Sequence, residues 1–321
     1  MDRRLLERVQ QAFPLSPRPF RELGEAVGLR EAECLERVQR LQAEGLIRHI
    51  NALFEGRALG YRNALVALQV PASGVGAAAE VINAHPGVSH NYLREHRYNM
   101  WFTIALPAAD DVEAVVAEMG RRAGAQSVLF LPTMKMFKLQ AINLAGNGGS
   151  PTPAPRRRAP SRTGRVELSP RECQAVRALQ SDLPLLTRPF LPLAEGVGLG
   201  EAELLKMGRG FLERGIMRRY SAQLHHVKMG YAANGMGCWV VPAGRVVAVG
   251  RELAKSPRVT HCYQRPTYPG WPYSLFTMVH APSREECQEV VADLSRRAGV
   301  ADYTLLFSTR ELKKSRVRYF E

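Results

Sequence analysis

Residues 88–103 combine side chains that could do chemistry with the spacing of a β-strand. Alternate residues of a strand point to the same face, so the first half of this stretch places four side chains together. These are Val88, His90, Tyr92 and Arg94. Since an imidazole, a phenol and a guanidinium are unusual on a core face, the stretch is a candidate functional site. The charged turn that follows contains His96 and Arg97, and His96 is the best single candidate for a functional imidazole.

The same pattern recurs 171 residues later, with the matching side chains His261, Tyr263 and Arg265. The turn after it, Pro266–Pro272, is expected to be three residues longer than its counterpart. Its three prolines, together with Tyr268 and Trp271, predict a stiff aromatic lip suited to covering a flat ligand. A single histidine on a strand is more often a structural hydrogen-bonding residue, and that alternative stays open in each half.

The repetition extends along the chain, on both sides of a Pro/Gly/Ser-rich segment at 143–165. Four motifs reappear at a constant offset of 170 residues. They pair Arg18-Pro-Phe20 with Arg188-Pro-Phe190, Glu25–Leu29 with Glu195–Leu199, Glu44–Arg48 with Arg214–Arg218, and Gly60-Tyr61 with Gly230-Tyr231. A register held that long indicates a tandem duplication. The expected domains are 1–60, 61–142, 166–230 and 231–321, with 143–165 as a linker.

Each half is expected to begin with a winged helix-turn-helix. In the first half Phe20, Leu23 and Val27 share a helical face, and Gly28 ends that helix. A second helix follows, and Leu46–Phe54 has the pattern of a β wing. The remainder of each half predicts the order βαββαβ, which is ferredoxin-like. The fold class is therefore α+β.

The predicted elements of the two ferredoxin-like domains correspond one to one. In the first they are Ala64–Val70, a helix to Ala84, Val88–Arg94, Asn99–Leu106, a helix over Val112–Ala123, and Val128–Pro132. In the second they are Gly237–Val241, Val246–Lys255, Val259–Arg265, Tyr273–His280, Arg284–Ala298 and Asp302–Phe307. Trp101 alternates with an apolar row that faces the helices, so it is expected on the opposite face of the sheet, which carries polar and aromatic groups.

Composition suggests an anionic partner in a reducing compartment. The 321 residues carry a net charge of +14, although part of this lies in charge runs of the linker and C-terminal tail that could simply be solvated. The five cysteines are scattered, which disfavours a disulfide framework or a zinc site. The N-terminus lacks an apolar signal segment and no apolar run is long enough for a membrane span, so a cytoplasmic protein is expected. A metal role for His225-His226 is disfavoured.

The combination resembles the leucine-responsive (Lrp/AsnC) regulators, on the markers Gly28-Leu29, Gly45–Arg48 and Gly60-Tyr61. In that family a helix-turn-helix precedes a ligand-binding βαββαβ domain whose sheets pack face to face in dimers. Specific DNA reading is nevertheless unlikely here. The second helix of each motif begins with two carboxylates, which stabilise the helix dipole but repel phosphates. These are Glu31 and Glu33 in the first half, and Glu201 and Glu203 in the second.

The stretch Tyr92–Thr103 is also similar to a signature of siroheme decarboxylases, and the whole chain resembles their fused, two-subunits-in-one form in haem d1 biosynthesis. The resemblance implies loss of two acetate carboxylates from siroheme, giving didecarboxysiroheme. It implies no organic cofactor, and no iron other than that of the substrate. The partner would be siroheme, a polyanionic tetrapyrrole, bound by a pseudo-dimeric chain that could itself form a homodimer.

Such a substrate needs cations for its carboxylates and aromatic rings for its macrocycle. The expected cations are Arg94, Arg97 and Arg265, with Arg48 and Arg218 in second place; the expected rings are Tyr92, Trp101, Tyr263, Tyr268 and Trp271. His96, His90 and His261 are the expected proton donors or iron ligands. The sequence leaves open which histidine contacts iron, whether both halves are active, and the order of the two decarboxylations. The alternatives are a tetrapyrrole-responsive Lrp/AsnC-type regulator and a tetrapyrrole chaperone.

Overall fold

The structure is a computed structural model, and it describes residues 2–139, 166–224 and 233–321. The chain divides into two compact units, and each unit combines equivalent parts of both halves. The first contains the described parts of Met1–Tyr61, Asn143–His225 and Arg318–Glu321. The second contains those of Arg62–Ile142 and His226–Val317. His225-His226, the pair considered for a metal role, lies outside the described residues.

The first unit contains the two helix-turn-helix motifs. In the first motif α2 (Pro19–Val27) ends at Gly28, whose φ of 79° needs a residue without a Cβ, and α3 (Glu31–Ala43) follows. The second motif contains α7 (Phe190–Glu195) and α8 (Glu201–Glu213). Each motif is preceded by a helix that the sequence patterns did not predict, α1 (Asp2–Gln11) and α6 (Pro170–Gln180). Gln180 of α6 exchanges hydrogen bonds with the backbone of Tyr319, which holds the C-terminal residues in this unit.

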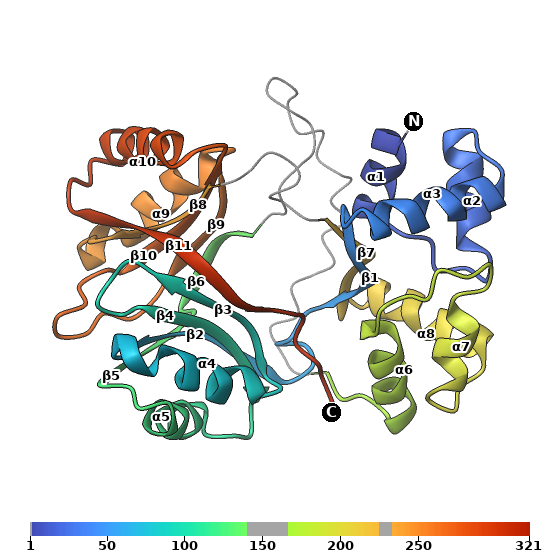
Figure 1. Cartoon of the computed structure of the whole chain (residues 1–321), viewed down its shortest axis with the longest axis horizontal. Coiled ribbons are helices and arrows are strands. Elements are labelled where there is room, and N and C mark those ends of the chain that lie inside the picture. The colour runs from blue at the N-terminus through green and yellow to red at the C-terminus, as the bar shows by residue number, and fades with distance from the viewer. Residues whose placement is uncertain (1, 140–165, 225–232) are drawn as a thin grey trace. The chain divides into compact units, whose positions relative to one another are not determined.

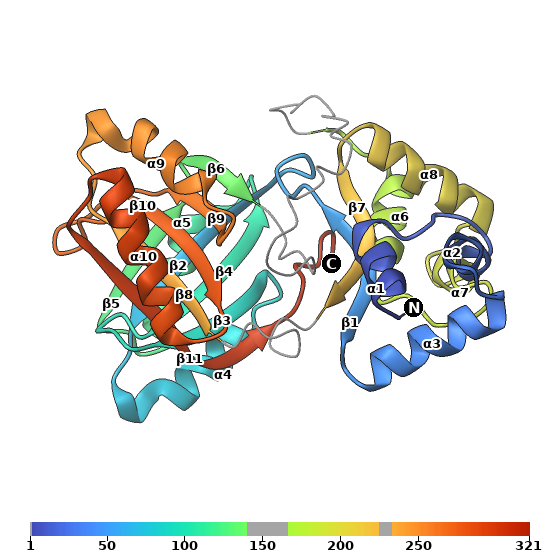
Figure 2. The same cartoon turned by 90° about the horizontal axis from the view of Figure 1, so that it is seen from above.

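The predicted wings are strands, but they do not form a wing within each half. β1 (Ile47–Phe54) and β7 (Met217–Leu224) pair with each other in an antiparallel two-stranded sheet that joins the two motifs. Figure 2 shows the two strands side by side. The halves of the chain are therefore paired as the subunits of a dimer would be.

The second unit contains both ferredoxin-like domains, as predicted. The first domain consists of β2 (Tyr61–Gln69), α4 (Val75–Ala84), β3 (Val88–Arg94), β4 (Met100–Pro107), α5 (Val112–Arg122) and β5 (Ser127–Pro132). The second consists of β8 (Ala233–Trp239), α9 (Val246–Lys255), β9 (Val259–Gln264), β10 (Leu275–Ala281), α10 (Arg284–Ala298) and β11 (Tyr303–Lys314). β8 begins four residues before the predicted start. Short 3₁₀ turns, Ala72–Gly74 and Ala243–Arg245, lead into α4 and α9.

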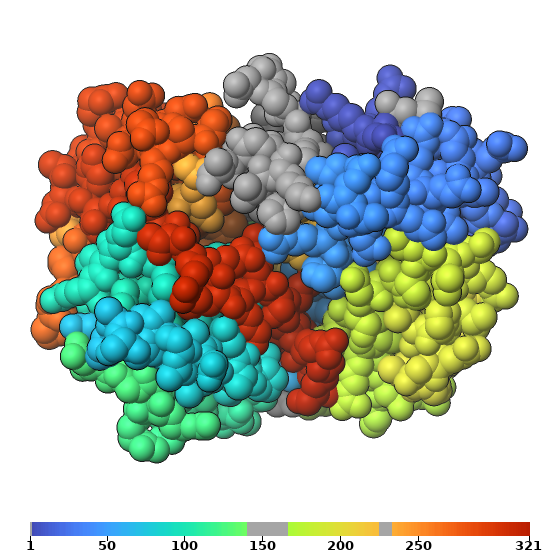
Figure 3. Space-filling model, in the orientation of Figure 1, coloured from blue at the N-terminus to red at the C-terminus, as the bar shows by residue number. Residues whose placement is uncertain are grey.

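The strands of the two domains form one nine-stranded sheet in the order β5-β2-β4-β3-β11-β8-β10-β9-β6. Two crossovers join the domains. The first part of β11 pairs with β8 of its own domain and its last part pairs with β3 of the other. A strand that was not predicted, β6 (Lys135–Leu139), likewise leaves β5 and pairs with β9. Figure 1 shows β11 passing from its own domain to the first, and in Figure 3 its red end lies on the surface of that domain.

The basic C-terminal tail is therefore part of a strand as far as Lys314, instead of a solvated charge run. Lys313 donates from Nζ to the backbone carbonyls of Asn83 and His85, at 2.7 and 3.3 Å. These bonds hold the crossing strand at the end of α4.

Three apolar clusters hold this unit together. Two of them lie between the sheet and the helices that cover it (Figure 1). One is under α4 and α5 in the first domain, and the other is under α9 and α10 in the second. The third lies on the opposite faces, and it contains side chains of both domains. Its fully buried members include Trp101 and Trp271, each of which contributes about 1.5–3 kcal/mol or more by leaving water. Trp101 thus points away from the helices, as predicted.

The predicted strand face of β3 is wrong at Val88, because a β-bulge lies at the start of the strand. Val88 pairs with Ile104 and His90 with Thr103, so one extra residue, Ser89, interrupts the alternation. Val88 therefore packs in the cluster under the helices, whereas His90, Tyr92 and Arg94 keep to the other face. The second half has the same bulge at Thr260, between Val259 and His261.

Among the described residues, no helix combines the length and the hydropathy that a membrane span requires.

Candidate active site

The turn that contains His96 is held by its own backbone. The His96 N–H donates to the Arg94 carbonyl at 2.9 Å, and His96 Nδ1 accepts the Tyr98 N–H at 3.0 Å. Half-burial and the neighbouring Arg97 both lower the pKa of His96 below its usual value, burial being the larger cause. His96 is therefore uncharged near neutral pH, with its hydrogen on Nε2.

The aromatic lip of the second half packs against this turn. Trp271 lies edge-on to His96 at 5.5 Å and to Tyr98 at 5.6 Å, and it contacts Trp101 at 5.5 Å between ring centroids. Its side chain has no exposed surface, so Trp271 fills space in the apolar cluster shared by the two domains and packs against His96. The prediction that the lip is stiff is consistent with this packing. Direct cover of a ligand by Trp271 or Trp101 stays a prediction, since both rings are buried in this structure.

The turns that follow β3 and β9 have different lengths. Leu93 pairs with Met100, seven residues on, and Gln264 pairs with Leu275, eleven residues on. The second turn is therefore four residues longer, one more than the sequence comparison predicted. The sequence comparison was one residue short, because the proline-rich turn has no strand pattern that would mark where strand pairing begins again.

Arg97 and Tyr268 connect the two turns to their surroundings. Arg97 is exposed, donates from Nη2 to the Gly270 carbonyl, and places its guanidinium 5.1 Å from the Tyr98 ring. The Tyr268 hydroxyl donates to the Phe130 carbonyl, and burial raises its pKa. The structure thus brings His96, Arg97, Tyr268 and Trp271 together, although the sequence divides them between its halves.

Arg94 and Arg265 occupy equivalent buried positions at the two strand crossovers. Arg94 donates from Nη1 to the Leu306 carbonyl of β11, at 2.7 Å. Arg265 donates from Nη1 to the Leu131 carbonyl of β5. Among the described residues neither forms an ion pair, and burial lowers the pKa of each to about 10. Their visible contacts hold the crossing strands, and contact with substrate carboxylates stays a prediction.

His90 and His261 each bond through Nδ1 to the hydroxyl of the bulge residue before them. The distance is 3.0 Å from His90 to Ser89 Oγ and 2.8 Å from His261 to Thr260 Oγ1. Thr260 Oγ1 also lies 3.0 Å from His280 Nε2. Tyr92 and Tyr263 lie beside these imidazoles, with ring centroids 6.2 and 6.0 Å away. The matched His and Tyr side chains therefore share one face in each half, as the duplication predicted.

Two of the candidate cations belong to the other unit. Arg48 is on β1 and Arg218 is on β7, where Arg218 forms an ion pair with Glu55. Both arginines belong to the helix-turn-helix unit, whereas His96 belongs to the ligand-binding unit. Their role in substrate binding stays a prediction.

The recognition helix, which would enter the DNA groove, is the second helix of each motif: α3 in the first and α8 in the second. The first carboxylate of each recognition helix is neutralised by an arginine of the same unit. Glu31 pairs with Arg18, and the equivalent Glu201 pairs with Arg188. Arg37, a basic residue of α3, is itself held by Asp2 and Glu33 at 2.8 and 2.7 Å. These pairs compete with phosphates for the arginines and support the prediction that specific DNA reading is unlikely.

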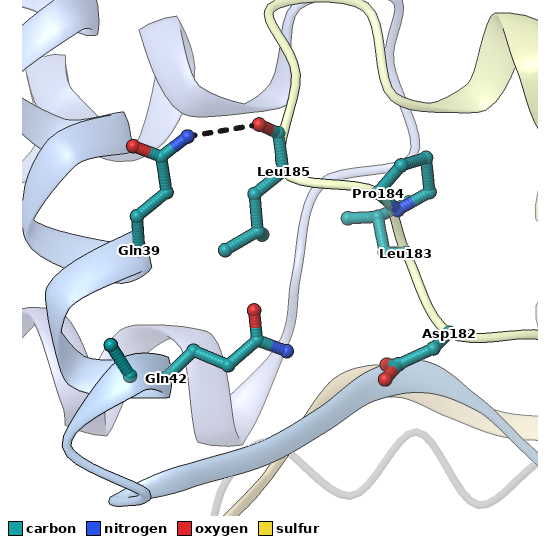
Figure 4. Close-up of a pocket in the computed structure, with 7 residues that line it drawn as sticks. Gln39, Gln42, Asp182, Leu183, Pro184 and Leu185 are labelled. Carbon is teal, nitrogen blue, oxygen red and sulfur yellow. Dashed lines mark hydrogen bonds between the residues drawn. The ribbon is translucent and has the colours of Figure 1, made fainter.

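A pocket of about 520 Å³ lies on the helix-turn-helix unit, and none of the predicted site residues lines it. Figure 4 shows it between α3 and the Asp182–Leu185 segment, where Gln39 donates to the Leu185 carbonyl at 3.1 Å. Asp182 is its only titratable lining residue and is bonded to His49 at 2.8 Å. It has no pair of groups suited to catalysis.

Sequence reasoning missed several residues next to the candidate site. Tyr273 packs on Trp271 at 4.8 Å, and burial raises its pKa. Thr260 and His280 were missed because a bulge and a strand pairing bring them to His261. The described residues contain no cluster of three or more metal-ligating side chains.

The fold and the site define a class of protein: a duplicated helix-turn-helix protein with AsnC-like ligand-binding domains. A model described as "AsnC-like ligand binding domain" matches residues 58–138 and 228–313. One described as "Siroheme decarboxylase NirDL-like HTH domain" matches 2–48 and 172–218.

Known proteins match the chain over its full length. A siroheme decarboxylase of Hydrogenobacter thermophilus is 37% identical over 319 residues, covering 99% of this chain and 94% of the relative. The crystal structure of the siroheme decarboxylase NirDL is 35% identical, with a TM-score of 0.76 over 100% of this chain and 94% of that one. Its complex with an iron-uroporphyrin III analogue has a TM-score of 0.75 at 34% identity, over 99% and 94%. The chain belongs to the siroheme decarboxylase family.

Proposed function

We propose that this chain is a siroheme decarboxylase, a carboxy-lyase that removes two acetate carboxylates of siroheme and gives didecarboxysiroheme in haem d1 biosynthesis. The observation that carries the proposal is the match to a siroheme decarboxylase over 99% of the chain, which includes both helix-turn-helix motifs and both ligand-binding domains. The structure of a relative with an iron-uroporphyrin III analogue supports a tetrapyrrole as the ligand class.

Each decarboxylation breaks the bond between the acetate methylene carbon and its carboxylate. Carbon dioxide leaves, and the electron pair of that bond stays on the methylene carbon. The carbon then takes up one proton and becomes a methyl group. An enzyme therefore needs cations that orient the carboxylates that are kept, and an acid next to the carbon that loses one.

His96 is our leading candidate for that acid. It is half-buried, its ring is fixed by the Tyr98 N–H and by Trp271, and Arg97 is its neighbour. In the free protein Arg97 helps to keep His96 uncharged. Carboxylates bound at Arg97 would offset that repulsion and raise the pKa of His96, so that the imidazole gains its proton when substrate is present. His90 and His261 are the further candidates.

The cationic and aromatic residues divide between two roles in this proposal. Arg97, Tyr92, Tyr263 and Tyr268 are at least partly exposed and would contact substrate. Arg94 and Arg265 are buried and hold the strand crossovers, so they would act mainly by positioning the walls of the site. The reaction would need no cofactor beyond the iron of the substrate, and a reducing cytoplasm and a homodimer remain our expectations.

The regulator alternative is not favoured. The chain lies within a family of enzymes, and its recognition helices begin with carboxylates that are already paired with arginines. A tetrapyrrole chaperone would share the same binding residues and differ only in the absence of turnover.

Anaerobic incubation with siroheme, followed by mass measurement of the product, tests the proposal. Loss of two carboxyl groups is the expected result for the wild-type chain without any added cofactor. Unchanged siroheme bound to the protein would support the chaperone instead. The variant His96→Ala should release little carbon dioxide, and full release by this variant would contradict the role given to His96.

A further inference from the structure

The last residues of the chain are fixed more firmly than a chain end usually is, since free termini tend to be poorly ordered. Tyr319 is buried, and the side chain of Gln180 exchanges two hydrogen bonds with its backbone, at 2.9 and 3.1 Å. Phe320 has a φ of 62°, in the left-handed region that residues with a Cβ rarely adopt. Such a conformation costs energy, so the contacts around Phe320 must offset it.

Tyr61 contacts both of these C-terminal residues. Its hydroxyl accepts the Phe320 N–H at 2.9 Å, and its ring centroid lies 4.9 Å from that of Tyr319 and 5.8 Å from that of Phe320. Tyr61 is also the first residue of β2, which is a strand of the same sheet as β3 and β11. The C-terminal residues therefore dock at the point where the chain enters the ligand-binding sheet.

The last part of β11 is weakly paired for a strand inside a sheet. β11 pairs with β8 from Tyr303 to Phe307, and with β3 from Ser308 to Lys314. Its pairing with β3 contains two register shifts, each of which interrupts the ladder of backbone hydrogen bonds. A strand end with an interrupted ladder opens readily unless the residues that follow it are fixed.

This weakly paired part of β11 forms a wall of the candidate site beside His90. Paired residues of antiparallel strands share a face, and β11 places Lys314 opposite His90. Directly after β11, the Ser315 N–H donates to the Ser89 carbonyl at 2.7 Å, and Ser89 is the bulge residue whose hydroxyl bonds to His90. Three residues, 315–317, separate β11 from the docked segment, which begins at Arg318. Docking of that segment therefore limits how far the wall can open.

We propose that Tyr319 and Phe320 are positioning residues for the candidate site, because their docking on Tyr61 and Gln180 holds the end of β11 against β3 beside His90. The helix-turn-helix unit then has a role that needs no DNA, since its helix α6 provides Gln180. The proposal rests on the proposed function only in taking siroheme as the ligand of the site.

Amide hydrogen exchange of the ligand-free chain, followed by mass spectrometry, tests the docking. Gln180→Leu removes both hydrogen bonds to Tyr319, which should speed exchange in peptides covering residues 308–317 by about tenfold or more. Tyr319→Ala should do the same, whereas Tyr319→Phe keeps the ring contact with Tyr61 and should exchange as the wild-type chain does. Gln39→Leu is the matched control, because Gln39 also donates from a helix of this unit to a backbone carbonyl.

A second measurement, which needs no variant, separates a positioning role from a merely structural one. Binding at the site and docking of the C-terminal residues are linked, so a ligand that needs the wall must also strengthen the docking. Iron(III)-uroporphyrin, added until its absorption change is complete, should therefore slow exchange at residues 315–321 of the wild-type chain. In the ligand-free variants, exchange at residues 275–281 of β10 should stay as in the wild-type chain, because the rest of the sheet remains folded.

The proposal is overturned if Gln180→Leu and Tyr319→Ala leave exchange at residues 308–317 unchanged, or if bound porphyrin leaves exchange at residues 315–321 unchanged. The proposed function is judged separately, by the mass of the product that the wild-type chain forms from siroheme. A chain that decarboxylates siroheme without these exchange effects refutes the positioning role alone. A chain that shows the effects without turnover refutes the proposed function alone.

Discussion

Replacing Trp271 by alanine tests whether the apolar cluster shared by the two ligand-binding domains supports the candidate acid. Trp271 has no exposed surface, and its ring contacts five others: His96, Tyr98, Trp101, Tyr273 and Phe276. Truncation of a fully buried tryptophan costs about 3–5 kcal/mol, and each aromatic pair contributes about 0.5–1.5 kcal/mol beyond its buried area. Trp271→Ala should therefore lower the free energy of unfolding of the ligand-binding unit by at least about 3 kcal/mol.

The tryptophans of the chain make this measurable for one unit. The sequence contains three, and Trp101, Trp239 and Trp271 all belong to the ligand-binding unit. Tryptophan fluorescence during urea unfolding thus reports on that unit, while circular dichroism reports on both. The midpoint seen by fluorescence should fall in Trp271→Ala. Because His96 loses the ring behind it, the rate of carbon dioxide release should fall at a temperature where the variant is still folded.

Trp271→Phe is the matched control. The Nε1 of Trp271 has no hydrogen-bond partner among the described residues, so a phenyl ring loses packing but no hydrogen bond. Its loss of stability should be smaller than that of alanine. An unchanged fluorescence midpoint in Trp271→Ala would refute the view that this ring stabilises the apolar cluster between the two domains. Normal turnover in a destabilised Trp271→Ala would refute its role in supporting His96.

Three other predictions concern charge. Arg97→Gln removes an exposed cation that contacts the Gly270 carbonyl, and siroheme titration should show weaker binding. Arg121→Gln on α5 is the control and should bind siroheme as tightly as the wild-type chain. Equal affinities of the two variants would contradict a carboxylate contact at Arg97. Burial lowers the pKa of His85 and His96, helped by Lys313 and Arg97 respectively. The unfolded chain therefore binds more protons than the folded one just below the usual histidine value, so urea midpoints should fall as pH decreases through 6.5, and less so in His85→Gln. A pH-independent midpoint would contradict these shifts. Gel shifts at physiological salt should show no sequence-dependent DNA binding, because the recognition-helix carboxylates and arginines are already paired; a tight complex with one sequence would favour a regulator.

Much of the architecture could be predicted because duplication doubles the signal. A constant offset identified the two halves, and the alternation of apolar and polar residues in each half predicted the βαββαβ order. The bulges at Ser89 and Thr260 could not be predicted, because an extra residue in a strand leaves no mark on local composition. They move Val88 and Val259 to the helix side of the sheet.

The resemblance implied a pseudo-dimeric chain, but the sequence did not show which strands pair between the halves. β6 and the end of β11 are too charged and irregular to be recognised as strands, and their partners are distant in the chain. Arg94 and Arg265 were predicted to face a ligand from their strand phase alone. Their burial against the Leu306 and Leu131 carbonyls follows from the crossovers, which sequence patterns do not encode.

By itself the sequence determined the residue types and their phase: His, Tyr and Arg on matched strands, and His96 in a turn that the second half lacks. The tertiary structure decided which of them meet. Trp271 packs on His96, a backbone N–H fixes the tautomer of His96, and Thr260 Oγ1 lies within hydrogen-bond distance of both His261 and His280. Local sequence sets a side chain's chemistry and direction, but its neighbours across 100 or more residues are set by strand pairing and by packing between the two domains.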